Sequence, residues 1–501
     1  MSYAKKLFSA IRPTIKNRDG YPAYARSAEE QYVQTLVTNT FGNTFYADQQ
    51  ELLSEADGLH HEMVQSNPQF MAKALVYARN EGYMRLQPLY GLAILSMVRP
   101  DLFAKIFLQV VRTPSDLTDF LTILQGMGRG EGGRAVKRQV NRFLSGMSEY
   151  WAIKYNGRGR GYNLGDAIAT AHPKPTDLKQ QALFRYLRGH EANLSLLPQV
   201  MAFEEMKKAP TEAEQLHWIE SGRLPHEVVT GAVKPTKAVW EALIDQMPTF
   251  ALLRHLNALE RSGVLENRYH LEKVVSRITD QRALQKAKIL PFRFAKAFRQ
   301  VQHPVLQDAL RDAVEYTFSN LPELEDRTAI FLDISGSMNG EYLQIGSVFA
   351  LALYKKTRGN SLFWLFDTAV EDAKPSRRDS ILTQADRIQA RGGTDTGAPV
   401  RKLLAEGRKV DQIVIITDEQ QNSGSPFYVA LQKYRDKVNP AVKAFIIDIA
   451  PYRSAMVPPQ DPNTFYIYGW SDTVLSYIAQ SAKGYESMVQ QIEDMDLGAE
   501  V

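Results

Sequence analysis

A single change in hydrophobic periodicity, near residue 322, constrains the fold of this 501-residue chain more than any other feature. Before it, apolar residues recur every three or four positions in segment after segment, which is typical of amphipathic helices. After it, short apolar runs alternate with helical stretches, which is typical of α/β folds. The sequence therefore predicts an N-terminal segment over 1–25, a helical part over 26–322 and an α/β domain over 323–501.

The helical part has the pattern of a series of short amphipathic hairpins. Helices are predicted at 27–41, 68–82, 86–98, 101–111, 118–127, 134–147, 177–189, 236–247, 265–278 and 303–318. Pro, Gly, Asn or Asp separates them, and the short connections make consecutive helices antiparallel neighbours. Stacked hairpins of this kind form an α-solenoid. An irregular helical bundle stays open as an alternative, because no strict repeat is visible. Residues 1–25 are expected to lack regular structure.

The α/β domain is predicted to be doubly wound around a parallel sheet. Five apolar runs have the length of buried strands, at 328–335, 361–367, 411–418, 442–450 and 464–470. Strands that are apolar on both faces and separated by helices imply a parallel sheet covered on both sides. Ligands of such sheets bind at the carboxyl ends of the strands. We therefore expect the functional polar residues at that edge.

Oxygen-bearing side chains at these strand ends predict a divalent-cation site. The candidate ligands are Asp333, Ser335, Ser337, Thr394 and Asp418. The first three occupy alternate positions after the first strand, so their oxygens project to one side, and the small residues between them allow a tight turn. Two carboxylates with hydroxyls form a hard oxygen set, which suits Mg²⁺ and disfavours soft metals. The chain has no cysteine, which excludes disulfides, thiolate metal ligands and cysteine nucleophiles.

Other interpretations of these acidic residues stay open. A phosphatase with an aspartate nucleophile also begins with a buried strand that ends in Asp, but it needs a second acid where Ser335 stands. A metal-dependent nuclease would use Asp333 and Asp418, although the sequence offers no third carboxylate motif and no obvious general base. The plainest alternative is that the residues only cap strands and helices and bind no ion.

Positive charge is concentrated in one stretch of the chain. The net charge is +4, yet residues 126–190 alone carry twelve Lys and Arg against four Asp and Glu. Such a concentration is the expected footprint of a polyanionic partner. On the helix that begins near Arg134, cations occupy one side and apolar residues the other. The candidate RNA-binding residues of this stretch are Arg129, Arg134, Lys137, Arg138, Arg142, Lys154, Arg158, Arg160 and His172.

Two further observations bear on this basic stretch. The loop after the helix mixes cations with aromatic residues and glycines, which suits phosphate contacts and base stacking. A merely solvated helix face is the plainer alternative. The spacing Gly128-x-Gly130-x-x-Gly133 matches a dinucleotide-binding fingerprint, but the segment before it is predicted as helix, whereas the fingerprint requires a strand. We therefore reject a dinucleotide site.

Taken together, the two parts resemble the Ro autoantigen family. The metal residues are similar to the metal-ion-dependent adhesion site of von Willebrand factor type A domains, with DxSxS at 333–337, a Gly-Gly-Thr loop and a strand-terminal Thr-Asp. The helical part resembles the family's RNA-binding module, called TROVE, and a bacterial member is the expected relative. The segments that carry this second resemblance lie at 70–96, 128–140, 154–175, 247–263 and 290–298.

This resemblance implies a ring of HEAT-like helices that the type A domain closes. It implies a protein without enzymatic activity that binds small noncoding Y RNA on an outer basic surface. Single-stranded 3′ ends of misfolded or fragmented RNAs would enter a central hole, and the ring would act as a scaffold in RNA quality control. Lys154, Arg158 and His172 match the family's Y RNA-contacting residues, and the helix around Arg134 and Arg138 matches a neighbouring basic helix. The Y RNA would also tether an exoribonuclease, polynucleotide phosphorylase.

Location and assembly are expected from what the sequence lacks. No apolar run approaches the roughly 20 residues of a membrane span, and the N-terminus has no signal-peptide core. We therefore expect a cytoplasmic monomer without membrane contact. The alternative function is an adhesion or adaptor protein that acts through the metal site.

Overall fold

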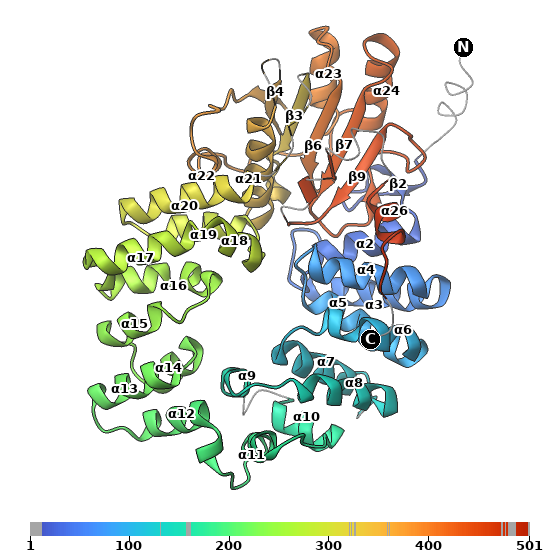
Figure 1. Cartoon of the computed structure of the whole chain (residues 1–501). Coiled ribbons are helices and arrows are strands. Elements are labelled where there is room, and N and C mark those ends of the chain that lie inside the picture. The colour runs from blue at the N-terminus through green and yellow to red at the C-terminus, as the bar shows by residue number, and fades with distance from the viewer. Residues whose placement is uncertain are drawn as a thin grey trace. The chain divides into compact units, whose positions relative to one another are not determined.

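The structure is a computed structural model of the chain. It describes residues 13–130, 132–156, 162–319, 321, 323–324, 327–357, 359, 361–471, 474–475, 477–478 and 487–498. The chain divides into two compact units, and Figure 1 labels their elements. The first unit contains residues 1–87, 288–298 and 310–496, and the second contains residues 88–287, 299–309 and 497–501. No helix within the described ranges is long and apolar enough to cross a membrane.

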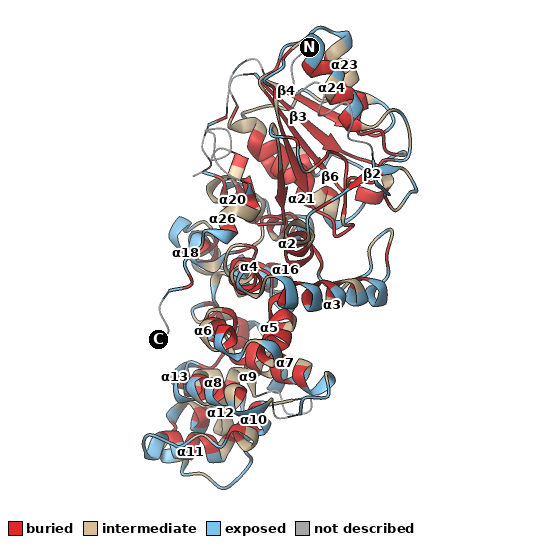
Figure 2. Ribbon diagram, turned by 90° about the vertical axis from the view of Figure 1, so that its right-hand side faces the viewer, coloured by how far each residue is buried: buried red, intermediate tan, exposed pale blue. Residues whose placement is uncertain are grey.

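The first unit contains a six-stranded sheet with the strand order β5-β4-β3-β6-β7-β9. Its strands are β3 (Thr328–Asp333), β4 (Leu362–Phe366), β5 (Val370–Asp372), β6 (Gln412–Thr417), β7 (Lys443–Asp448) and β9 (Thr464–Tyr468). Neighbouring strands are parallel, except that β5 runs antiparallel to β4 at one edge. Strands β3 and β6 are buried along their whole length, as Figure 2 shows. The predicted doubly wound sheet is confirmed, and β5 is an addition to it.

Helices connect the strands, and the order in which strands are added to the sheet reverses at β3. They are α21 (Glu341–Lys355), α22 (Ile381–Ala385), α23 (Ala398–Ala405) and α24 (Phe427–Lys437). After β3 the chain passes through α21 to β4 on one side, and it later returns to β6 on the other side. The switch point of such a sheet lies at the carboxyl ends of these strands. A Cβ on Gly346 of α21 would lie 2.9 Å from Leu332 Cδ1, so glycine allows the helix to approach the sheet closely.

The N-terminal residues belong to the same unit. β1 (Ile15–Lys16) and β2 (Pro22–Ala25) form an antiparallel hairpin, and β2 also pairs with β8 (Ser454–Ala455). Helices α2 (Ala28–Thr38), α3 (Gln49–Ser66) and α4 (Pro68–Asn80) follow. The expectation that residues 1–25 lack regular structure is therefore wrong for residues 13–25. A strand whose partner lies near the other end of the chain leaves no local periodic pattern.

The second unit is helical. Its elements include α6 (Pro100–Val110), α7 (Pro114–Gly126), α8 (Gly133–Ser145), α9 (Glu149–Tyr155), α10 (Leu164–Ala171), α11 (Leu178–Leu187), α12 (Pro198–Lys208), α13 (Glu212–Gly222), α14 (His226–Ala232), α15 (Lys237–Ile244), α16 (Thr249–Arg261), α17 (Arg268–Ile278) and α18 (Gln281–Ala287). Side chains of Thr113, Ser148 and Asp177 accept hydrogen bonds at the N-termini of α7, α9 and α11, which explains where these helices begin.

Packing within this unit is mostly between helices that are close in sequence. Examples are α12 with α13, α13 with α15, and α15 with α17. The helix-rich architecture is confirmed, and such short-range packing is typical of helical repeats, whereas the assignment of a repeat over an irregular bundle stays a prediction. Helices α5 (Leu86–Val98), α19 (Phe292–Gln300) and α20 (Pro304–Thr317) each contain residues of both units. Closure of the helices into a ring stays a prediction, as does the domain boundary between residues 322 and 323.

Candidate functional site

The candidate metal ligands lie on three loops at the carboxyl edge of the sheet, all within the first unit. Asp333 is the last residue of β3, and Asp418 directly follows β6, its neighbour in the sheet. Thr394 lies on the loop before α23. The exposed fractions of the five predicted ligands range from 0% for Asp333 to 5% for Ser337. The loops are therefore placed where the parallel-sheet argument predicts a ligand site.

Hydrogen bonds arrange the loop after β3 around the Asp333 carboxylate. The Ser335 backbone N donates to Asp333 Oδ1 at 2.9 Å, and the hydroxyl oxygens of Ser335 and Ser337 lie 3.2 Å apart. The Thr417 hydroxyl, from the end of β6, donates to Asp333 Oδ2 at 2.6 Å. Thr417 was not predicted as a site residue, although the Thr-Asp pair at the strand end is a sequence signal that could have identified it.

Hydrogen bonds join the loop that carries Thr394 to the loop after β3 and to the loop after β6. The Gly336 backbone N donates to Gly392 O at 3.0 Å, and the Thr394 backbone N donates to Asn422 Oδ1 at 2.9 Å. Gly392 has a φ of 69°, and a Cβ there would lie 2.7 Å from Asp367 Oδ2, so this turn requires glycine. Asn422 was not predicted as a site residue, because a single Asn after a strand carries no specific sequence signal.

The two buried carboxylates have the electrostatics of a cation site. Burial raises the pKa of Asp333 to about 6, against the lowering effect of its hydrogen bonds with Thr417 and Ser335. Burial and the negative charge of Asp333 raise the pKa of Asp418 to about 7. Asp418 Oδ2 is buried without a hydrogen-bond partner among the described residues. Carboxylates and hydroxyls in this state fit a hard divalent cation, which would neutralise the acids and bind the unpaired oxygen.

Two tyrosines, one in the loop between α2 and α3 and one in the loop after β7, lie beside this site. Burial, the hydrogen bond of its hydroxyl to Asp19 and the charge of Asp418 together raise the pKa of Tyr46. The Tyr46 ring packs edge-on against the ring of Tyr452, with 5.4 Å between centroids. Burial and the Asp418 charge also raise the pKa of Tyr452 to about 12. Sequence reasoning missed these tyrosines, because they are far from the metal motif along the chain.

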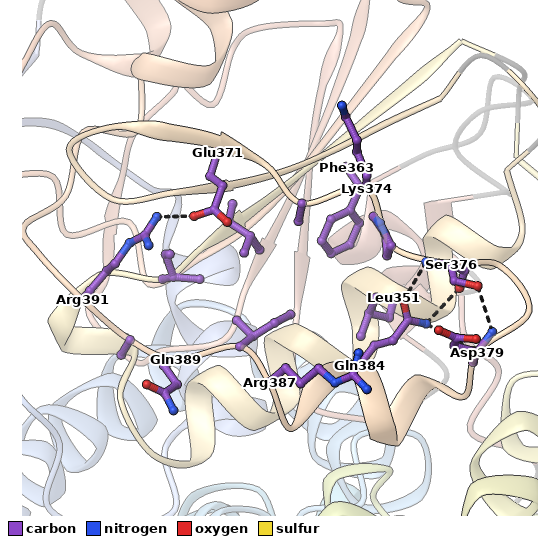
Figure 3. A pocket seen from close by; sticks show the side chains of 16 residues that line it. Leu351, Phe363, Glu371, Lys374, Ser376, Asp379, Gln384, Arg387, Gln389 and Arg391 are labelled. Carbon is purple, nitrogen blue, oxygen red and sulfur yellow. Dashed lines mark hydrogen bonds and ion pairs between the residues drawn. The ribbon is translucent and has the colours of Figure 1, made fainter.

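A separate cavity of about 540 Å³ lies close to the same loops (Figure 3). Its described lining includes Ile334 and Arg391, which flank the metal-site loops, but none of the five candidate ligands. The Arg391 backbone N donates to Ile334 O at 2.6 Å, and its guanidinium binds Glu371 at 2.6 Å. The cavity is thus a neighbour of the candidate metal site and not the site itself.

The predicted basic helix is α8, in the second unit. It buries Val136, Val140, Phe143 and Leu144, and it packs against α6 and α10. The cationic ridge of α8, which we define as Arg134, Arg138 and Arg142, is exposed, while Lys137 is half-buried. The described residues form no ion pair with any of the three arginines of the ridge. The ridge is therefore available to an anionic partner, as its spacing predicts.

Lys154 differs from its predicted setting in two ways. It lies in the last turn of α9 and not in a loop, and its side chain is only 15% exposed. Its Nζ lies 3.2 Å from Glu227 Oε1, and 5.6 Å and 5.5 Å from the ring centroids of Tyr150 and Tyr155. Burial acts to lower the pKa of Lys154, but Glu227, Tyr155 and Tyr150 together outweigh burial and raise it. Glu227, whose carboxylate offsets the charge of Lys154, was not predicted from the sequence.

The other predicted RNA contacts fall into two groups. Arg129, before α8, and His172, which ends α10 with a φ of 50°, are both exposed. The His172 backbone N donates to Ile168 O at 3.0 Å, which fixes the helix end. Arg158 and Arg160 lie outside the described residues. The structure thus brings the α8 ridge, Arg129, Lys154 and His172 into one unit, and the RNA-binding role of these residues stays a prediction.

Comparison with known families finds two matching domains. Residues 227–356 match the TROVE domain, and residues 327–482 match the Ro60 vWA domain. The TROVE match begins after α8, so it does not by itself assign a role to the cationic ridge. The vWA match contains all five candidate metal ligands.

Two relatives and one solved structure support the same relationship. The chain is 25% identical to the RNA-binding protein RO60 of Deinococcus radiodurans over 94% of its own length and 95% of that protein. It is 25% identical to the RNA-binding protein RO60 of Caenorhabditis elegans, covering 75% of this chain and 71% of that protein. The crystal structure of the Deinococcus radiodurans RO (RSR) protein matches with a TM-score of 0.68 at 23% identity, over 91% of this chain and 100% of that chain. This last similarity confirms the predicted fold.

Proposed function

The chain belongs to the Ro family, with a TROVE domain followed by a Ro60-type vWA domain, and from this premise we propose that it binds RNA. Its two relatives are named RNA-binding proteins. The observation that carries the proposal for this chain is the cationic ridge of α8, which is exposed and free of ion pairs among the described residues. An exposed row of arginines on a helix that is packed through its opposite face is suited to phosphate contacts.

The finer proposal is that structured small noncoding RNA, the Y RNA of the family, binds on the surface that contains the ridge. Lys154, Arg158 and His172 would add contacts to this RNA. Single-stranded 3′ ends of misfolded or fragmented RNAs would enter the hole of a ring formed by the helices. In this proposal the protein is a monomeric scaffold without catalysis of its own, and the Y RNA tethers an exoribonuclease, polynucleotide phosphorylase, that degrades the presented RNA.

Salt dependence tests the phosphate contacts directly. Each phosphate contact contributes about −0.9 for double strands, or about −0.7 for single strands, to the slope of log affinity against log salt concentration. We expect the variant Lys154→Ala, Arg158→Ala, His172→Ala to bind Y RNA more weakly and to have a flatter slope in a filter-binding titration. Binding and slope equal to those of the parent protein would refute the assignment of these three residues.

At the candidate metal site we propose a bound divalent cation, with Mg²⁺ as the best fit to the donor set. Asp333, Ser335, Ser337, Thr394 and Asp418 would hold it. When bound, the cation would supply a positive centre that neutralises the two buried carboxylates and offers a position for an oxygen ligand. The support is the unpaired, buried Asp418 Oδ2 beside a second buried acid.

The remaining candidate functions act through the metal site alone. An adhesion or adaptor protein would lose partner binding in EDTA and in Asp333→Ala, while its RNA binding would be unaffected. A metal-dependent nuclease would cleave labelled RNA in Mg²⁺ and lose this activity in Asp418→Ala. Among the described residues, no group of three His, Asp or Glu side chains is arranged to hold a metal ion, which weighs against a carboxylate-rich nuclease site.

A further inference from the structure

The cavity beside the metal-site loops (Figure 3) lies within the first unit, at the edge of the sheet. Part of its wall is apolar: Phe363 and Leu365 belong to β4, Leu351 belongs to α21, and Ile334 follows β3. Its volume of about 540 Å³ falls within the range of about 300–1,000 Å³ that is usual for small-molecule pockets. Such pockets combine an apolar lining with a few polar groups that orient the ligand. The cavity therefore has the size and the apolar wall of a binding site for a small organic molecule.

Hydrogen bonds hold the loops around the cavity in place. Between β5 and α22, the Ser376 backbone N donates to Gln384 Oε1 at 2.8 Å, and Gln384 Nε2 donates back to Ser376 O at 2.9 Å. On the side of the metal-site loops, the backbone of Arg391 is bound to Ile334 O and its guanidinium to Glu371. A ligand would therefore enter a site that is already formed, which reduces the entropic cost of binding.

The charged side chains that line the cavity leave an excess of positive charge. Three are cations, Lys374, Arg387 and Arg391, and two are anions, Glu371 and Asp379. Arg391 and Glu371 neutralise each other in an ion pair. Within the part of the chain that the structure describes, Lys374, Arg387 and Asp379 form no ion pair. Two cations against one anion give the rim a net charge of +1, which favours an anionic ligand.

We propose that this cavity binds a small organic molecule with an apolar or aromatic body and a single carboxylate. The body packs against Phe363 and Leu351, which lie between Lys374 and Arg387 in the view of Figure 3. The carboxylate binds the Arg387 guanidinium, whose planar fork suits two parallel hydrogen bonds, and Lys374 adds a second positive charge. A monoanion matches the rim, whereas a phosphate monoester carries about −1.5 to −2 charges at pH 7. The inference is independent of the proposed RNA-binding and metal sites, because it uses none of their residues.

Titration of 1-naphthylacetate into the full chain tests the proposal, with the neutral 1-naphthylacetamide as the matched ligand. Binding is followed by NMR at isoleucine methyl groups, because Ile334 and Ile388 line the cavity and Ile278 of α17 does not. We expect 1-naphthylacetate to shift the first two signals alone, with a Kd of about 1 mM or lower, as is usual for a ligand of this size. The amide is expected to bind about 3- to 10-fold more weakly, because it lacks the charge. If 1-naphthylacetate shifts neither signal, or if the amide binds as tightly, the proposal is overturned.

Two further titrations define where the ligand binds and which acid it carries. A carboxylate can also coordinate a cation at the candidate metal site, so 1-naphthylacetate is titrated both in EDTA and in Mg²⁺. Equal affinity in the two buffers is expected, and binding that is lost in EDTA would assign the ligand to the metal site and overturn the proposal. Tighter binding of 1-naphthyl phosphate than of 1-naphthylacetate would overturn the preference for a carboxylate.

The variant Arg387→Gln tests the residue that binds the carboxylate. Arg387 is exposed, so its replacement is expected to leave the fold intact. The variant is expected to bind 1-naphthylacetate about 3- to 10-fold more weakly and to bind the neutral amide as the parent does, a difference that a merely structural role would not produce. Arg378→Gln is the matched control, because Arg378 is an exposed arginine of the same segment that does not line the cavity. Equal affinity of the two variants for 1-naphthylacetate would overturn the role of Arg387.

Discussion

The guanidinium of Arg26 binds the carboxylate of Glu419, the residue that directly follows the candidate metal ligand Asp418. Both side chains are at most 1% exposed, and Arg26 Nη2 also lies 2.9 Å from Asp448 Oδ2. The rings of Tyr466 and Tyr468 lie 4.7 Å and 5.2 Å from the guanidinium carbon. These buried ion pairs join the residue that follows β2 to the carboxyl ends of β6 and β7 within the first unit.

Removal of Arg26 is expected to destabilise the first unit strongly. Arg26→Met would leave two buried carboxylates without their cation, and breaking a buried ion pair from one side costs about 3–5 kcal/mol. The measurement is the free energy of unfolding from urea titrations at pH 7. Arg18→Met is the control, since its pairs with Glu51 and Glu55 are partly exposed and are worth at most about 1 kcal/mol. Equal losses in the two variants would contradict the importance of the buried pair.

Protonation of His60 is expected to make the first unit less stable in mild acid. His60 is fully buried, with Nδ1 2.9 Å from the Tyr32 hydroxyl and Nε2 3.1 Å from Gln87 Oε1, and burial lowers its pKa to about 4. The unfolded chain takes up this proton near pH 6.5, so stability is fully present above that pH. The free energy of unfolding decreases by up to about 3 kcal/mol as the pH falls toward 4.

The His60→Gln variant provides the test, because glutamine keeps a hydrogen-bonding side chain that does not titrate. The loss of unfolding free energy between pH 7 and pH 4.5, measured with urea, should be smaller in His60→Gln than in the parent protein. The same loss in both proteins would show that other groups cause the acid sensitivity.

Neutralising Glu227 is expected to strengthen RNA binding. Burial acts to raise the pKa of Glu227, but its hydrogen bond with His226 and the charge of Lys154 lower it to about 2, so it is an anion at neutral pH. Glu227→Gln would free the Lys154 ammonium for a phosphate and steepen the log–log salt slope by about 0.7 to 0.9. Filter binding of a structured RNA measures both quantities. Glu272→Gln on α17 is the control, because Glu272 pairs with the exposed Arg268. Weaker binding by Glu227→Gln would contradict a phosphate-contacting Lys154.

The sequence predicted those parts of the structure that depend on local patterns. The five strands, the loop from Asp333 to Ser337 and the cationic face of α8 all follow from the spacing of residue types over a few positions. The parts that it missed are pairings between distant residues: β2 with β8, Arg26 with Glu419, and Lys154 with Glu227. Such contacts are created by tertiary packing, and nothing in the neighbouring sequence of either partner indicates them.

The central claim is that RNA binds to the helical part of the chain through the cationic ridge, independently of the metal site. The most direct measurement is the affinity for a structured RNA with a single-stranded 3′ end, as a function of salt, for three proteins: the parent, Asp333→Ala, and the ridge variant with Arg134, Arg138 and Arg142 changed to Ala. We predict that Asp333→Ala binds like the parent, while the ridge variant binds more weakly and its slope is flatter by about 2 to 3. The claim would be contradicted if the ridge variant bound RNA with the affinity of the parent, or if the parent protein did not bind RNA at low salt.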